Sequence, residues 1–306
     1  AAAGLAQGGP GPDLTSRRAP AYVDTPGARV ALVATASSFT AMSPAADARG
    51  QRRARPGLSP LNVRALRLVT AEQMRVLAAI PARGRRGDTT IETPPRELSI
   101  GREGFRLGEG GGLTYEVDAK DREAVLQGVA QAEAGADLVV FSIHAHQGDG
   151  AANGAEGPAD FLQPLFHAAI DAGADVVVRH GPHALEGIEI YRGKPIFYGM
   201  ASLFFDVGDA ERRFGPAGRE WAFPPEWDDG AIAVTEFRDG RAAEIRIHPL
   251  VMRFDTPDRM GMPRPANAEE AIRILERVRR QSARFGVEVL IENGVGIIRP
   301  DLGEQS

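Results

Sequence analysis

The sequence lacks cysteine and long apolar runs, and both absences narrow the kinds of protein it can encode. Without a cysteine among its 306 residues, the chain forms no disulfide, no thiolate metal site and no thiol nucleophile. No apolar run approaches the roughly 20 residues that a membrane-spanning helix needs, and no basic stretch followed by an apolar one marks an export signal. Basic residues do not outnumber acidic ones (36 against 41), so the net charge of -5 predicts that nucleic acid is not a partner.

The sequence does contain alternating apolar strands and amphipathic helices. With 43% hydrophobic and 25% charged residues, the chain has enough apolar residues to bury a core. The patterns predict strands over 28–35, 138–143, 176–178 and 193–205, helices over 70–80, 121–134, 158–172 and 267–285, and hairpins over 231–249 and 287–298. Residues 37–60 read as a long loop. A strand, helix, strand succession indicates an α/β fold with a right-handed crossover between parallel strands.

Two histidine pairs follow the central strands of this succession. His144 and His146 come directly after the apolar run 138–143, and His180 and His183 come shortly after 176–178. Because the carboxyl ends of parallel strands lie at one edge of a sheet, where open α/β sheets bind their ligands, we expect the four side chains to form one site.

The chemistry of this site has more than one interpretation. Neutral imidazoles can bind Zn, Mn or Fe, and two pairs of histidines can converge on a single ion. A histidine pair in a loop is also often only a hydrogen-bonded structural element. Two carboxylates, Asp149 and Glu189, lie close to the pairs in sequence, and Glu189 is a candidate catalytic residue unless it pairs with an arginine or caps a backbone donor.

The stretch GADVVVRHGPHALEGIEIYRGKPIFYG resembles the signature of the bacterial capsule-synthesis CapA family, also called the PgsA or poly-γ-glutamate biosynthesis family. The resemblance extends over 28–306 and implies a metallophosphoesterase-like fold, a layered β-sandwich flanked by helices. The family's early Gly-Asp, Asn-Leu-Glu and Asn-Asn-His motifs are not found here, so the chain looks like a family protein without its amino-terminal third. We therefore expect residues 1–27 to be a loosely ordered leader and 28–306 a single domain.

The resemblance also assigns roles to residues. His144 matches the family's histidine after the central strand and His183 that of its Pro-His pair, while Gly181 replaces a further histidine whose place His180 could take. The implied function is a metal-dependent hydrolase associated with capsule or poly-γ-glutamate synthesis. Its divalent metal (Mn, Fe or Zn) would be bound by His144, His180 and His183, with His146 and Glu189 as catalytic residues.

Two alternatives remain open at this point. Some relatives are metal-independent peptide epimerases, in which paired histidines or carboxylates remove and return a proton at a Cα. A third interpretation is a non-catalytic envelope protein that binds a polymer. In all three the partner is an anionic polymer or peptide, and the resemblance suggests a location at the cell envelope or outside the cytoplasm.

Overall fold

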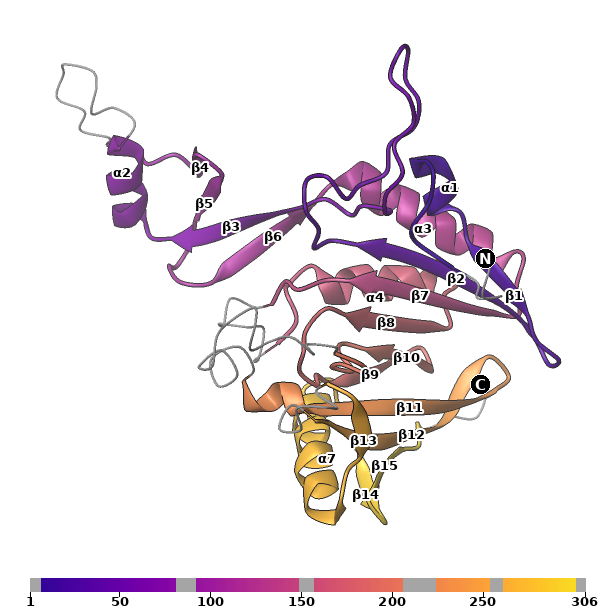
Figure 1. Cartoon of the computed structure of the whole chain (residues 1–306). Helices are drawn as coiled ribbons and strands as arrows, with labels where there is room; N and C mark the ends of the chain where they lie inside the picture. Colours follow the sequence, from indigo (N-terminus) through magenta and orange to yellow (C-terminus); the bar gives the residue numbers. More distant parts are fainter. Residues whose placement is uncertain (1–6, 81–91, 149–156, 206–223, 254–260, 301–306) are drawn as a thin grey trace, which may run out of the picture.

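The computed structural model describes residues 7–80, 92–148, 157–205, 224–253 and 261–300, and the structural statements below concern these residues. Its centre is a six-stranded sheet (Figure 1). The strands in spatial order are β1 (Ala21–Asp24), β2 (Arg29–Ala36), β7 (Leu138–His144), β8 (Val176–His180), β10 (Lys194–Phe197) and β9 (Ile188–Tyr191). The four inner strands are parallel, and β1 and β9 pair antiparallel at the two edges.

Helices cover one face of this sheet. They are α3 (Ala119–Glu133), which packs on β2 and β7, and α4 (Leu162–Asp171), which packs on β8. The buried side of α3 includes Val125 and Val129, and that of α4 includes Leu165 and Phe166, as the helical periodicity predicts. These side chains form one core with alternate residues of the strands, such as Phe141 and Val177. The predicted parallel pair and its helical crossover are confirmed.

A second, five-stranded sheet packs on the other face of β8, β9 and β10. It contains β11 (Asp229–Arg238), β12 (Arg241–Met252), β13 (Pro263–Pro265), β14 (Leu290–Glu292) and β15 (Val295–Ile298), with α7 (Ala268–Ala283) beside it and the short 3-10 helix η3 (Pro225–Asp228) before it. Val176 and Phe197 share a core with Ile245 and Ile274. The helices α3 and α4, the six-stranded sheet and the five-stranded sheet form successive layers, and this mixed architecture confirms the expected α/β class.

Both predicted hairpins and both predicted capping boxes are present. The turn residues Asp239 and Gly240 have φ of 50° and 71°, as a two-residue turn of the primed type requires. Asn267 accepts from the N–H of Glu270, whose carboxylate in turn accepts from the N–H of Asn267. Thr70 and Gln73 make the same exchange at α2 (Ala71–Ala79).

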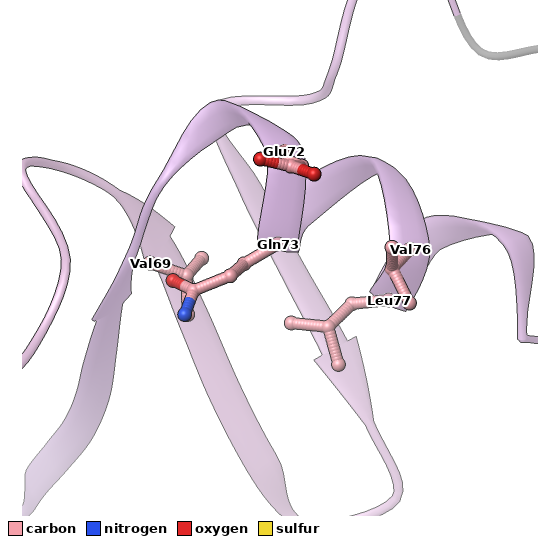
Figure 2. A pocket seen from close by; sticks show the side chains of 5 residues that line it. All are labelled: Val69, Glu72, Gln73, Val76 and Leu77. Atoms are coloured by element: carbon pink, nitrogen blue, oxygen red, sulfur yellow. The ribbon is translucent and has the colours of Figure 1, made fainter.

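A third sheet projects from the body as an arm (Figure 1). It contains β3 (Val63–Val69), β4 (Glu97–Ile100), β5 (Glu103–Leu107) and β6 (Leu113–Val117), with α2 at its far end. A hollow of about 410 Å³ between α2 and the end of β3 is lined by Val69, Glu72, Gln73, Val76 and Leu77, none of them a predicted site residue (Figure 2). The sequence patterns predicted α2 but not this sheet.

In the described part of the expected leader 1–27, residues 7–27, the chain forms regular elements. Asp13 accepts from the N–H of Ser16 and caps α1 (Leu14–Arg18), and Ala21–Asp24 pairs with β2 as the edge strand β1. Tertiary contacts order this segment because β2 offers it an open edge, and Arg18 forms an ion pair with Asp121 of α3. In the described part of the chain, no helix is long and apolar enough to cross a membrane.

Candidate functional site

The two histidine pairs do meet, at the carboxyl edge of the six-stranded sheet. In the register of β7 and β8, His144 lies directly opposite His180. Because successive residues of a strand point to opposite faces, Phe141 and Ile143 enter the helix-side core while Ser142 and His144 lie on the other face. This alternation places a hydroxyl and two imidazoles next to one another.

Hydrogen bonds join these three side chains in a short relay. The Oγ of Ser142 lies 3.1 Å from Nε2 of His180, and Nδ1 of His180 lies 3.0 Å from Nδ1 of His144. Two proton arrangements satisfy both bonds. If the Ser142 hydroxyl donates, His144 accepts at Nδ1 and carries its own proton on Nε2; if Ser142 accepts, His144 donates from Nδ1 and its Nε2 is an acceptor. His144 Nε2 is therefore an acid in one arrangement and a base in the other.

The second histidine of each pair lies on the other side of His144. The ring centroid of His146 is 4.8 Å from that of His144 and 6.0 Å from that of His183. The Nδ1 of His183 lies 3.0 Å from Oγ of Ser202. The ring centroid of His183 is 4.7 Å from that of Phe205 and 4.2 Å from that of Trp227. An aromatic wall thus closes this end of the cluster.

The surroundings keep all four imidazoles neutral near pH 7. Burial lowers the pKa of His144, and it is the main cause of the lowered pKa of His146 and His183, with smaller contributions from neighbouring positive charge. His180 presents part of its ring to solvent, yet burial of the rest, followed by repulsion from His144 and His146, lowers its pKa to about 4. Neutral imidazole is the form that exchanges protons or binds metal.

A fully buried arginine holds the loop that carries His146. Arg179 donates from Nε to the carbonyl of Ala145 at 2.9 Å, from Nη2 to that of Gln147 at 2.7 Å and from Nη1 to the carboxylate of Glu186 at 2.7 Å. Burial lowers the pKa of Arg179, and the charge of Glu186 opposes this shift. Arg179 therefore fixes the backbone on both sides of His146.

The end of β2 completes the base of the site. The N–H groups of Ser37 and Ser38 donate to the carbonyl of His144, and Ser38 Oγ accepts from the N–H of His146 at 2.7 Å. Both serine hydroxyls donate to Oε1 of Gln147 at 2.8 and 3.0 Å. Three strand ends therefore determine where the rings lie.

Glu189 makes its contacts in a different place. Its Oε1 lies 2.8 Å from Nε2 of His167 on α4, and its Oε2 accepts from the hydroxyl of Tyr198 at 2.7 Å. His167, expected to be a packed or surface residue of the second helix, also stacks on Tyr191 at 3.8 Å. The structure thus does not bring Glu189 to the four histidines, because β9 places it beside α4. Asp149 lies outside the described residues.

The described residues do not form a metal-ligand set by themselves. Among them no group of three or more histidines and carboxylates is arranged to hold an ion. Both ring nitrogens of His180 are already in hydrogen bonds, with Ser142 and His144. The assignment of His144, His180 and His183 as ligands therefore remains a proposal, and no chemical step is derived through a metal below.

Several residues of the site were missed by the sequence patterns. Arg179 interrupts a buried strand with a charge, which was a usable signal for a structural ion pair. Ser38, Ser202 and Trp227 gave no signal, because each comes from a different segment and reaches the histidines only in the folded chain.

This chain matches one protein family and is similar to several known proteins. Residues 1–207 match the family described as "Bacterial capsule synthesis protein PGA_cap". The uncharacterized protein y4sH of Sinorhizobium fredii is 33% identical over 331 residues, which cover 97% of this chain and 70% of y4sH. The family match includes residues 1–27.

Shorter matches connect the chain to proteins with functional names. The PGA biosynthesis protein CapA of Bacillus subtilis is 40% identical over 88 residues, or 29% of this chain and 22% of that protein. A probable polyglutamine synthesis accessory protein of Mycobacterium tuberculosis is 33% identical over 165 residues, or 54% of this chain and 37% of that protein. With more than half of its residues matched to one family, the chain belongs to the bacterial capsule synthesis protein PGA_cap family.

Proposed function

We propose that this protein takes part in making or processing an anionic polymer of the poly-γ-glutamate kind, and that His144, His146, His180 and His183 act on the polymer by acid–base chemistry. The names of the Bacillus and Mycobacterium relatives support the polymer class. The relay from Ser142 through His180 to His144 is the single observation that supports the chemistry, because it can take up and return a proton.

The residues of the site have separate roles in this proposal. His144 presents Nε2 to the polymer and exchanges a proton with it, while His180 and Ser142 shift the relay between its two arrangements. His183 and Trp227 form a wall against which the polymer lies, and Arg179 positions His146 from below. Removal of a proton from a Cα and its return on the opposite face would lead to epimerisation. Removal of a proton from a water that attacks the amide carbonyl, with protonation of the leaving nitrogen, would lead to hydrolysis.

A direct test compares His144→Asn with the wild type on defined poly-γ-glutamate. Polymer length reports hydrolysis, and solvent deuterium in the polymer reports epimerisation. Because a positioned general acid or base contributes about 100-fold or more, we expect His144→Asn to lose at least that factor in whichever reaction occurs. His248→Asn is the matched control, since His248 lies in β12 opposite Ile232. Equal rates in both variants would refute the acid–base role, and polymer binding without any reaction would favour the non-catalytic interpretation.

A second candidate is the metal-dependent hydrolase with a metallophosphoesterase-like layering that the family resemblance implies. The observation in its favour is that three neutral imidazoles are neighbours, since the ring centroid of His146 lies 4.8 Å from that of His144 and 6.0 Å from that of His183. Such a metal would activate water and polarise the bond to be cleaved. Elemental mass spectrometry of the purified protein, with activity measured before and after chelation, decides between the candidates. Stoichiometric Mn, Fe or Zn, with loss of activity on chelation, would favour the hydrolase.

A further inference from the structure

The loop between β2 and β3 contains an ordered hairpin that is rich in arginine. Backbone bridges pair Ala46 with Arg55 and Arg49 with Arg52, each through two hydrogen bonds of 2.8 to 3.1 Å. Gly50 has a φ of 59°, which closes the turn between Arg49 and Arg52. We call residues 46–55 the arginine hairpin. It bears four exposed arginines: Arg49, Arg52, Arg53 and Arg55.

Contacts at its base hold the hairpin in place. Thr15 donates its N–H and its hydroxyl to the two carboxylate oxygens of Asp47, both at 2.9 Å. Gly57 exchanges two backbone hydrogen bonds with Gly11, and a Cβ on Gly57 would lie only 2.3 Å from the carbonyl oxygen of Ser43. In Figure 1 the segment between β2 and β3 projects beyond α1 and α3. The anchor thus orders the base while the four arginines remain exposed, although Arg55 also donates from Nε to the carbonyl of Pro44 at 3.0 Å.

The arginines of the hairpin differ from many others in the described part of the chain. Thirteen described arginines on other elements form ion pairs with carboxylates; on the arm, for example, Arg64 and Arg106 both bind Glu97 and Glu116. None of the ion pairs between described residues includes an arginine of the hairpin. Its one carboxylate, Asp47, is already bound by Thr15. With four arginines and one carboxylate, the hairpin bears a net positive charge in a chain whose net charge is -5.

We propose that the arginine hairpin is a binding site for a flexible polycarboxylate chain, an inference that rests on the proposed function for its choice of polymer. Guanidinium groups bind carboxylates through paired hydrogen bonds, and closely spaced arginines can bind successive carboxylates of one chain. The loop that carries the hairpin leaves the histidine site at Ser37 and Ser38, next to His144. A polymer held by the hairpin is therefore tethered to the same loop that supports the site.

The composition of the hairpin disfavours two other anionic partners. Residues 46–55 contain no aromatic side chain on which a nucleic-acid base could stack. They also contain no large apolar side chain that could insert into a membrane surface. A polymer that offers only carboxylates requires neither an aromatic nor a large apolar side chain in its binding site.

The test measures binding of labelled poly-γ-glutamate and of labelled poly-aspartate to the whole chain. The hairpin variant carries R49Q, R52Q, R53Q and R55Q. The matched control carries R238Q, R246Q, R279Q and R299Q, which change the net charge equally at exposed, ion-paired arginines on other elements. We expect the hairpin variant to bind both polymers about 10- to 100-fold more weakly and with a flatter salt dependence, and the control to remain within about threefold of the wild type.

Three results would overturn the proposal: equal binding by wild type and hairpin variant, an equal loss in the control, or tighter binding of single-stranded DNA or anionic vesicles than of either polymer. Poly-aspartate separates this proposal from the function of the histidine site. If hairpin-dependent binding of both polymers persists while poly-γ-glutamate is never altered, the hairpin stands and the catalytic proposal fails. If the histidines act on the polymer and the hairpin variant binds it as tightly as the wild type, the catalytic proposal stands and the hairpin proposal fails.

Discussion

At the scale of single residues, the protein holds His180 in its neutral form. The ring is the middle member of the relay, and both its nitrogens are in hydrogen bonds. Its surroundings lower its pKa from 6.5 to about 4, so protonation is easier in the unfolded chain than in the folded one. The unfolded state then binds more protons between these two values, and the free energy of unfolding rises with pH across that window. This contribution is complete above about pH 6.5 and is lost as the pH falls toward 4.

This linkage predicts the effect of His180→Asn on acid stability. We expect the variant to lose less stability than the wild type between pH 7 and pH 4, by about 1 kcal/mol once solvent screening of the half-exposed ring is allowed for. The measurement is urea unfolding at a series of pH values with chelator present. His248→Asn, a histidine-to-asparagine change outside the relay, is measured alongside as the control. Parallel curves for the His180 variant and the wild type would contradict the lowered pKa.

At the scale of elements, Arg179 joins the ends of β7 and β8. It is completely buried, and its guanidinium satisfies carbonyls of the loop after β7, the carbonyl of Tyr198 at 3.2 Å and the carboxylate of Glu186. A buried ion pair adds little net stability, because desolvation offsets the attraction. Its contribution here is geometric, since the loop that it binds carries His146.

The buried pair predicts an asymmetry between single and double replacement. Arg179→Met leaves the carboxylate of Glu186 buried against an apolar side chain, so we expect a loss of about 3–5 kcal/mol in the free energy of unfolding. Arg179→Met combined with Glu186→Met should recover part of that loss, because the buried carboxylate is removed while the carbonyls that Arg179 satisfied remain without it. Denaturant unfolding measures both, and a double variant as unstable as the single one would contradict the prediction. NMR signals of the His146 ring should shift in both variants, because both lose the loop contacts of Arg179.

At the scale of the whole molecule, α7 links the two large sheets. The N–H of Ile188 at the start of β9 donates to Oγ of Ser282 at 3.0 Å, and the ring of Phe285 stacks on Tyr198 at 4.5 Å. Gly187 lies at the closest approach, where a Cβ would be 2.5 Å from the carbonyl oxygen of Gln281. Since that oxygen belongs to backbone, it cannot move aside without shifting the helix.

Gly187→Ala should therefore weaken the packing between the sheets. We expect a loss of about 1–3 kcal/mol in the free energy of unfolding, the usual range for overpacking. Gly27→Ala is the control, because a Cβ there meets nothing within 4 Å, and it should be neutral or slightly stabilising. Thermal unfolding of the two variants compares them directly. Equal melting temperatures would show that α7 adjusts to the added methyl group.

Features that depend on a few neighbouring residues could be predicted from the sequence. The Asp239-Gly240 turn needs only two residues that tolerate positive φ, and the capping box at Asn267 and Glu270 needs only a spacing of three. The convergence of the histidine pairs was also predictable, because a strand, helix, strand unit leaves little freedom in where its strand ends lie.

Only the tertiary structure decided which residues share a contact. Glu189 is close to His183 in sequence, yet β9 turns it toward His167, whereas Trp227, 44 residues beyond His183, lies against its ring. β1 forms because Ala21–Asp24 pairs with the edge of β2, and no local pattern in these four residues predicts that pairing. The sequence by itself determined the strands, the helix ends and the edge at which the histidines gather, because those depend on short-range spacing. The relay, the buried Arg179 and the aromatic wall depend on distant segments packing together, which only the folded chain specifies.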